Sequence, residues 1–277
     1  MHKRLLLHAG SKRVRQQIIV RGSLSGKKPM VVINPARESK TVFVKSILEA
    51  AEITELSNAI ANSPARGFVQ RVTARRGATL EQNYVRGKTI GDRIVSEHSA
   101  KEVARILAGI HAAKIPKSLR KPAIDAISNR IVNSIRELTA HQALSAAEAG
   151  KVRGLFRKIP TKSSIAICHM DINKDNVVES GKSVRIIDIM DTKVYFRDFD
   201  IAKTIFGLRL SPPLEAKFLT AYQNAGGNAI GFNANRKFWI DLVLLSKLRA
   251  ADERRRVEKS PLAERKFLRL KKLLLAQ

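Results

Sequence analysis

The sequence predicts an α+β fold in two unequal parts, a small strand-rich N-terminal part and a larger, mostly helical C-terminal part. Runs of β-branched residues dominate up to Gly87, whereas helical spacing of apolar residues dominates after it. The chain has 277 residues, of which 44% are apolar and 27% are charged. A chain of this length and composition can bury a sizeable core and is too apolar to be disordered.

The N-terminal part alternates β-branched runs with turn residues. Gly22 and Gly26 separate the first two runs, and Asn34-Pro35 opens the turn before the third. Asn62-Ser63-Pro64 then ends a segment of helical periodicity. The pattern predicts strands over 17–20, 30–33, 41–44, 67–73 and 79–85, and a helix over 46–62.

The C-terminal part changes to helical periodicity. Val103, Ile106, Leu107 and Ile110 recur at i, i+3, i+4 and i+7, which places them on one apolar helix face. The pattern predicts helices over 92–113, 121–139 and 142–156, strands within 163–188, and mostly helix from about 198 to the end apart from a Gly/Asn-rich loop over 224–235.

Charge is the unusual feature of the composition. Lysine and arginine number 52 against 24 acidic residues, which gives a net charge of +28. Such a surplus favours an anionic partner, which could be nucleic acid, an anionic membrane surface or a phosphorylated substrate. The basic helix expected near the C-terminus is typical of a solvated face, and a membrane or nucleic-acid surface is the alternative.

Other features exclude several classes of protein. A single cysteine excludes a disulfide framework and a multi-cysteine zinc site. No uninterrupted apolar run is long enough to span a bilayer. The N-terminus carries only a three-leucine run and no small-residue cleavage site, which argues against a secretory signal. We expect a cytoplasmic protein, and a transit peptide is the alternative because the segment is basic and lacks acids, although it has little serine.

The segment that carries chemistry begins at a short apolar run, 165–168. This run leads into a polar loop with His169 and Asp171, and Asn176 follows five residues after Asp171. The next two apolar runs flank a turn, which is a hairpin pattern. A turn centred on Lys182 would place Asn176 directly opposite Asp188.

Such a pair of side chains suits a magnesium ion. Carboxylate and amide oxygens are the ligands that Mg²⁺ takes when it is bound together with substrate phosphates. Asp171, a second acid in the neighbouring loop, could orient a hydroxyl group or accept its proton.

This segment resembles the catalytic core of the protein-kinase-like phosphotransferases, in particular the aminoglycoside phosphotransferase and choline–thiamine kinase branch. The loop is His-x-Asp-x4-Asn, and an Ile-Asp pair follows at Asp188. Further acids that fit this branch follow at Asp191 and in Asp200-Ile201-Ala202. Leu107-Ala108-Gly109-Ile110-His111 fits its helical Leu-Ala-x-Leu-His motif, and there is no Asp-Phe-Gly.

The resemblance extends toward the N-terminus. Lys45, at the end of the third expected strand, fits the ATP-contacting lysine, and Glu55 is chosen as its ion-pair partner with Glu52 as the alternative. Tyr84 and Val85 open an aromatic-hydrophobe-x-Gly run that fits the hinge where adenine meets the backbone. The candidate nucleotide loop, 21–28, is only loosely rich in glycine.

The resemblance implies a bilobal protein-kinase-like fold and an ATP- and Mg²⁺-dependent transfer of the γ-phosphoryl group to a hydroxyl of a small molecule. It divides the chain into a nucleotide-binding lobe over 1–87 and a catalytic and substrate-binding lobe over 88–277. Asp171 would be the base, and Asn176 and Asp188 the metal ligands. His169, Asp198 and Asp200 are interpreted as structural residues.

Two other functions stay open at this stage. The same fold could serve as a protein kinase or an effector kinase, although no activation segment is recognisable. It could also serve as a basic pseudokinase that binds RNA or anionic lipid. Within the first hypothesis, the positive charge favours an anionic acceptor over the cationic acceptors of aminoglycoside type.

Overall fold

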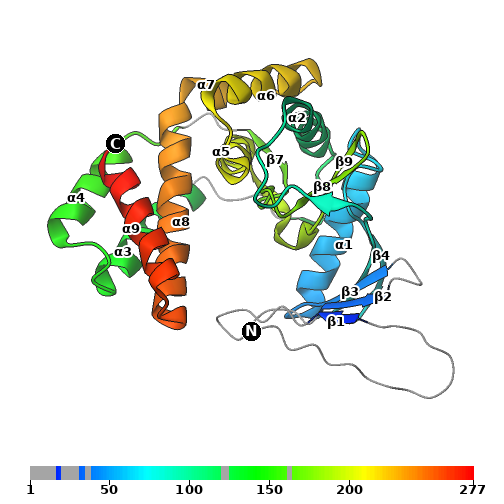
Figure 1. Ribbon diagram of the computed structural model, residues 1–277, viewed down its shortest axis with the longest axis horizontal. Helices are drawn as coiled ribbons and strands as arrows, with labels where there is room; N and C mark the ends of the chain where they lie inside the picture. The colour runs from blue at the N-terminus through cyan, green and yellow to red at the C-terminus, as the bar shows by residue number, and fades with distance from the viewer. Residues whose placement is uncertain (1–16, 20–30, 35–38, 120–124, 161–163) are drawn as a thin grey trace.

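The computed structural model describes residues 17–19, 31–34 and 39–277, apart from 120–124 and 161–163. A strand-rich region with one long helix lies at one end of the molecule, and most helices lie at the other (Figure 1). The candidate nucleotide loop at 21–28 lies outside the described residues. The predicted boundary between lobes at residue 87 remains a prediction.

The N-terminal region is built on an antiparallel sheet with strand order β1-β2-β3-β5-β4. Its strands are β1 (Gln17–Ile19), β2 (Val31–Asn34), β3 (Ser39–Phe43), β4 (Val72–Arg76) and β5 (Thr79–Asn83). Residues alternate between the two faces of a strand, so Lys40 shares a face with the fully buried Val42. Lys40 also lies directly opposite Gln82 of β5.

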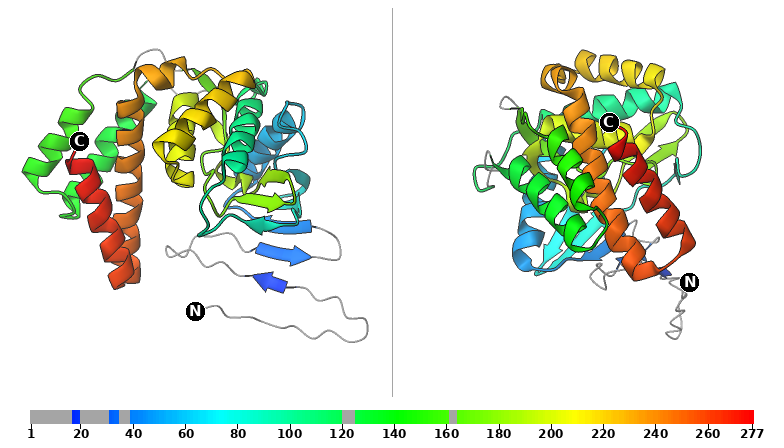
Figure 2. Two further views of the ribbon diagram at one scale, coloured as in Figure 1. Left: turned by 45° about the horizontal axis from the view of Figure 1, so that its top comes forward. Right: turned by 90° about the vertical axis from the view of Figure 1, so that its left-hand side faces the viewer.

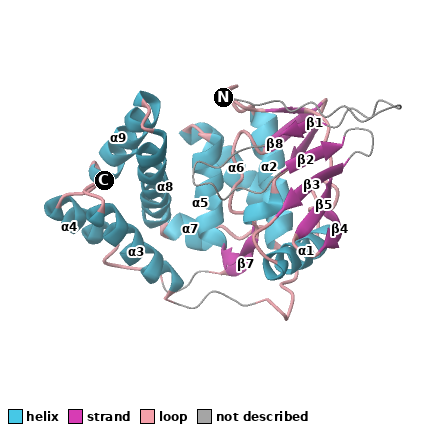
Figure 3. Ribbon diagram, turned by 90° about the horizontal axis from the view of Figure 1, so that it is seen from below, coloured by secondary structure: helices cyan, strands magenta, loops and turns pink. Residues whose placement is uncertain are grey.

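A single long helix, α1 (Ile47–Ala61), covers this sheet (Figure 3). The hydroxyl of Ser46 caps its first turn by accepting from the backbone N–H of Glu49. Ile53, Leu56 and Ile60 form its buried face, which packs against β4 and β5. The helical spacing of these three residues therefore decides how the helix sits on the sheet.

The chain leaves the sheet through 84–87 and enters β6 (Lys88–Thr89), which pairs with β8. Gly87 has a φ of +142°, and a Cβ there would come within 2.5 Å of Val178 Cγ1 and 2.6 Å of the Glu179 carbonyl oxygen. Only glycine fits at this close approach. The crossing between the two regions therefore packs closely against the hairpin of β8 (Val177–Ser180) and β9 (Ser183–Ile186), which the sequence predicts to be the catalytic hairpin.

The C-terminal region places short strands among helices. Its strands are β7 (Ile165–Cys168), β8 (Val177–Ser180), β9 (Ser183–Ile186) and β10 (Lys193–Phe196), and its helices are α2 (Glu97–His111), α3 (Ala126–Ala140), α4 (Ala146–Leu155), α5 (Arg197–Leu208), α6 (Pro212–Asn224), α7 (Ile230–Ala234), α8 (Arg236–Glu258) and α9 (Pro261–Leu275). β7 pairs with β10, and β8 pairs with β9. α2 packs on α6, and α5 packs on α8.

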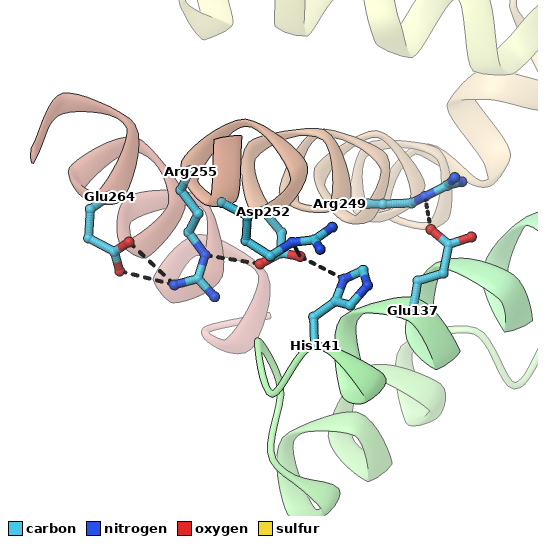
Figure 4. Close-up of polar contacts among 7 residues, drawn as sticks. Glu137, His141, Arg249, Asp252, Arg255 and Glu264 are labelled. Atoms are coloured by element: carbon cyan, nitrogen blue, oxygen red, sulfur yellow. Dashed lines mark hydrogen bonds and ion pairs between the residues drawn. The ribbon is translucent and has the colours of Figure 1, made fainter. Parts of the chain in front are cut away.

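Helices α3, α4, α8 and α9 gather on the far side of α5 from the sheet (Figure 2). Figure 4 shows the polar network that joins three of them. The buried carboxylate of Asp252 on α8 contacts His141 at 3.0 Å, Arg255 at 2.9 Å and Arg256 at 3.2 Å. Arg255 continues to Glu264 of α9. The network fixes α8 to the end of α3 and to α9.

Several predicted elements differ from the structure in place or length. The strand expected over 67–73 forms at Val72–Arg76, and the helix expected over 92–113 is Glu97–His111. The loop expected over 224–235 contains the short helix α7, and β10 was not predicted at all. None of the described helices combines the length and the apolar character that crossing a bilayer requires.

The register of the catalytic hairpin differs from the predicted register by one residue. Val177 pairs with Ile186 and Ser180 with Ser183, so the turn lies between Gly181 and Lys182 instead of on Lys182. The residue opposite Asn176 is Ile187, whose N–H donates to the Asn176 carbonyl oxygen at 2.9 Å. The predicted direct pairing of Asn176 with Asp188 is wrong, and Asp188 follows one residue later.

Candidate active site

The buried carboxylate of Asp200 on α5 holds the polar loop that follows β7. Asp200 accepts hydrogen bonds from the backbone N–H groups of His169 and Met170, each at 2.9 Å. Met170 has a φ of +67°, a conformation that a non-glycine residue adopts only when its surroundings hold it there. Asp200 therefore fixes the turn that presents Asp171.

Asp200 is itself fixed by a second helix. His111 of α2 contacts Asp200 Oδ2 through Nε2 at 3.1 Å, and its Nδ1 hydrogen-bonds with the Tyr222 hydroxyl at 2.7 Å. Burial acts to raise the pKa of Asp200, but the hydrogen bond from His111 and the other donors lower it below its usual range. The carboxylate therefore stays ionised, as its role as an acceptor requires.

His169 lies at the centre of this loop and is fully buried. Among the described residues, neither of its ring nitrogens has a hydrogen-bond partner. Burial lowers its pKa, which favours the neutral ring. The structural role of His169 remains a prediction.

Two amides orient the carboxylate of Asp171. Asn173 and Asn176 each donate from Nδ2 to Asp171 Oδ2 at 3.0 Å. Burial raises the pKa of Asp171, while the positive charges of Lys203 and Lys247 oppose that rise. Among the described residues Asp171 has no ion-pair partner within 4.0 Å, so its second oxygen can accept a proton from a substrate.

Asp188 lies at the end of the catalytic hairpin in a strained conformation, with a φ of +65°. Its N–H donates to Gln70 Oε1 at 3.0 Å, and Gln70 Nε2 donates to the Asn83 carbonyl oxygen at 2.8 Å. These two bonds anchor Asp188 to the end of β5. Its carboxylate is 37% exposed and lies 4.0 Å from Lys40 Nζ.

Among the described residues, Lys40 forms an ion pair with Asp188, and Lys45 does not. Lys45 is exposed, and its N–H donates to Glu49 Oε2 in the turn before α1. Lys40 is only 16% exposed and reaches Asp188 from the sheet face that it shares with Val42. Next to it, Gln82 Nε2 contacts Met190 Sδ at 3.3 Å, so the same face holds the 188–190 segment at two points.

The predicted partners of Lys45 lie elsewhere. Glu55 Oε2 accepts from the Ser118 hydroxyl at 2.5 Å, and Glu52 is exposed. No ion pair joins Lys45 to either glutamate within the described residues. Asp191 is exposed at the end of the 3₁₀ turn Ile189–Asp191.

The segment predicted to be the hinge lies between β5 and β6, beside the catalytic hairpin. Tyr84 is 38% exposed and Val85 is buried. Both follow the strand that carries Gln82, whose side chain contacts the 188–190 segment. The predicted contact of Tyr84 and Val85 with adenine remains a prediction.

The donor set suits a magnesium ion held together with a nucleotide. Asn176 donates through Nδ2 to Asp171, and within the described chain its Oδ1 accepts no hydrogen bond. Asp188, one residue beyond the position opposite Asn176, offers a partly exposed carboxylate. Both are oxygen donors, which a hard divalent cation prefers. Lys40, on the sheet side of Asp188, supplies a positive charge for phosphate groups.

Comparison with known proteins gives a likeness in structure only. No family model and no curated protein matches the chain. A candidate aminoglycoside phosphotransferase from Ralstonia eutropha matches with a TM-score of 0.70 at 15% identity, covering 97% of this chain and 92% of the other. A choline/ethanolamine kinase family protein from Mesorhizobium loti matches with a TM-score of 0.64 at 16% identity, covering 92% and 89%. The streptomycin–ATP–APH(2")-IIa ternary complex matches with a TM-score of 0.59 at 14% identity, covering 87% and 90%.

This chain has the fold of the aminoglycoside phosphotransferases and choline kinases. The predicted α+β, bilobal kinase-like fold is thereby confirmed, and the likeness spans nearly the whole chain. At these identities the similarity establishes the phosphotransferase fold alone, so activity has to be argued from the side chains at the site.

Proposed function

We propose that this protein is an ATP- and Mg²⁺-dependent phosphotransferase that transfers the γ-phosphoryl group to a hydroxyl of a small-molecule acceptor. The observation that carries the proposal is the arrangement of Asp171, Asn176 and Asp188. Asp171 is oriented through one oxygen by two amides and has no cation bound to it among the described residues. Asn176 and Asp188 offer metal-ligating oxygens beside it.

The reaction is a direct displacement at phosphorus. The acceptor hydroxyl oxygen forms a bond to the γ-phosphorus, and its proton passes to the free oxygen of Asp171. The bond between the γ-phosphorus and the bridging oxygen breaks, and ADP leaves with that electron pair. Positioning and charge neutralisation supply most of the acceleration in such transfers.

The other residues hold the nucleotide. Asn176 and Asp188 would hold Mg²⁺, which neutralises charge on the phosphate oxygens when bound. Lys40 would brace the phosphates from the face of β3, in place of the Lys45 that the sequence predicts. Tyr84 and Val85 would contact the adenine.

The short connection after Asp188 favours a small acceptor over a protein. The chain passes through the 3₁₀ turn Ile189–Asp191 directly into β10, which pairs with β7, and α5 begins at Arg197. Little chain is therefore left to form a platform for a peptide. Transfer to proteins, and RNA or lipid binding without catalysis, are the competing outcomes of the tests.

The first experiment measures Mg²⁺-dependent ADP formation from ATP, with water and with a panel of alcohols as acceptors. We expect Asp171→Asn to lower the rate by about 10²–10⁴-fold, because the group that takes the proton is lost. Asp175→Asn is the matched control. Asp175 is exposed in the same loop, and the same substitution there should change the rate by less than about threefold.

Three results would contradict the proposal. The first is a wild-type protein that forms no ADP with any acceptor. The second is an Asp171→Asn variant as active as the Asp175→Asn control. The third is transfer to lysate proteins in preference to all small alcohols, which would favour the protein-kinase alternative.

A further inference from the structure

One face of α5 lies against the catalytic loop and carries a lysine. A Cβ on Gly207 would come within 2.5 Å of the Ile172 carbonyl oxygen and 3.2 Å of Asn173 Cα, so the helix touches the loop here. Lys203 lies one helical turn before Gly207 and therefore on the same face. This places Lys203 beside the loop that carries Asp171, and its side chain is only partly exposed.

A second lysine, Lys247, lies on α8, which packs on α5 (Figure 1). Arg130 of α3 joins the two helices. Its Nε donates to Ser246 Oγ at 3.1 Å, and its guanidinium lies 4.8 Å from the ring centre of Phe199. Ser246 precedes Lys247, and Phe199 lies one turn before Lys203. Lys203 and Lys247, which we call the lysine pair, therefore lie on two packed helices, each within one turn of the residue that contacts Arg130.

The charges of the lysine pair act on each other and on the base. Burial raises the pKa of Asp171, and Lys203 and then Lys247 lower it. Burial lowers the pKa of Lys203, and Lys247 lowers it further. Lys266 of α9 lies close enough to Lys247 for their charges to interact as well. Positive charge therefore accumulates on the α5–α8–α9 side of Asp171.

Neither member of the lysine pair has a hydrogen bond or an ion pair within the described residues. The acids that act on Lys203 are Asp171, Asp200 and Asp191. Asp171 is bonded to two amides, and Asp200 to His111 and the backbone of the loop. Partly buried charges are normally paired, because desolvation is costly. Two ammonium groups on packed helices, with no direct ion-pair partner among the described residues, form a site that favours an anion.

We propose that the lysine pair binds the anionic group of the acceptor, so that the substrate is a small hydroxylated anion, an alcohol or sugar that carries a phosphate or a carboxylate. The inference rests on the proposed phosphotransferase function. The anionic group would dock on Lys203 and Lys247 while the hydroxyl to be phosphorylated reaches Asp171. An acceptor that carries an ammonium group would be repelled at the same place.

The experiment compares acceptors that differ in charge. The probes are glycerol 3-phosphate, glycerol and choline as one set, and gluconate, glucose and glucosamine as a second. ADP formation is measured with saturating ATP and Mg²⁺, and the acceptor-free rate is subtracted. We expect the anionic member of at least one set to be used with a kcat/KM at least tenfold above that of its cationic member, and the set that responds tells a phosphate group from a carboxylate.

Variants test whether the lysine pair causes that preference. Lys203→Met and Lys247→Met should each lower the anion-to-neutral ratio of kcat/KM by about tenfold. Lys151→Met removes the same charge from an exposed position on α4 and should leave the ratio unchanged. If the lysines served only the transferred phosphoryl group, rates with neutral and anionic acceptors would fall together, and the ratio would not move.

The outcomes separate the two proposals. An enzyme that forms ADP in an Asp171-dependent way but ignores both anionic acceptors, or prefers the cationic ones, overturns the acceptor proposal and leaves the phosphotransferase function standing. An unchanged ratio in Lys203→Met and Lys247→Met also overturns it. A wild-type protein that forms no ADP at all would contradict the proposed phosphotransferase function itself.

Discussion

The catalytic loop and strand β3 both contribute to the site, but they are determined in different ways. The loop is fixed by a chain of polar contacts that runs from Tyr222 through His111 and Asp200 to the backbone of His169 and Met170. Strand β3 takes its place from its pairing with β2 and β5 and from the burial of Val42. Specific polar side chains therefore set the conformation of the loop. The pairing of the whole sheet, by contrast, sets which residue of β3 faces the site.

The difference explains why the position of a site lysine on β3 is harder to predict from the sequence than that of Asp171. Asp171 comes shortly after a buried strand in the sequence, and this short spacing does not depend on how the loop is arranged. Lys45 follows the apolar run 41–44, but the alternation of a strand puts Lys40 on the face of Val42 and toward Asp188. A shift of an odd number of residues moves a side chain to the opposite face.

The largest effect expected from this comparison concerns the two lysines. Lys40→Met should lower kcat/KM for ATP by about 10²-fold, because a cation that meets the phosphates is lost. Lys45→Met, the matched control at an exposed position, should change it by less than about twofold. Steady-state kinetics with varied ATP measure both. A large loss in Lys45→Met with little loss in Lys40→Met would show that Lys45 contacts ATP, and it would contradict the role given to Lys40 on β3.

The second prediction tests the contacts below the catalytic loop. Asp200→Asn replaces a buried anion that accepts from two backbone groups and from His111. We expect the variant to lose about 3 kcal/mol of unfolding free energy and most of its activity. Urea unfolding measures the first quantity. The exposed Asp92→Asn control should stay within about 0.5 kcal/mol of wild type, and equal stability of both variants would contradict this account.

The third prediction uses pH. The pKa of Asp171 is raised by burial, and the base must be ionised to accept a proton. The rate should therefore fall on the acid side at a higher pH than an ordinary aspartate would give. Lys203→Met removes a charge that lowers this pKa, so the acid limb of its pH–rate profile should move to still higher pH. A limb that stays in place, or moves to lower pH, would contradict the geometry around Asp171.

The smallest effect is expected at Glu55. Its carboxylate accepts from Ser118 instead of pairing with a lysine of the site. Glu55→Gln should change kcat/KM for ATP by less than about twofold and cost less than about 1 kcal/mol of stability. A loss of tenfold or more for ATP would show that Glu55 acts on the nucleotide site after all.

The sequence predicts most of the architecture because local patterns carry it. Helical spacing predicts α1, α2 and α3, and the order of motifs along the chain predicts the phosphotransferase fold. The features that the sequence does not predict depend on residues that are distant in sequence. β10 forms because Lys193–Phe196 pairs with β7, and the hairpin register depends on where the turn settles between Gly181 and Lys182. The lysine pair comes from two helices that meet only in the fold.

A thermal-shift titration with ATP, with and without Mg²⁺, tests the central claim most directly. A ligand that binds only the folded protein stabilises it, by about 2.7 kcal/mol at one hundred times its Kd. We predict a rise in the Tm of the wild type that depends on Mg²⁺ and that Asp188→Asn loses, while Asp92→Asn keeps it. A wild-type protein unmoved by millimolar ATP, or an Asp188→Asn variant with the full Mg²⁺-dependent rise, would contradict the account.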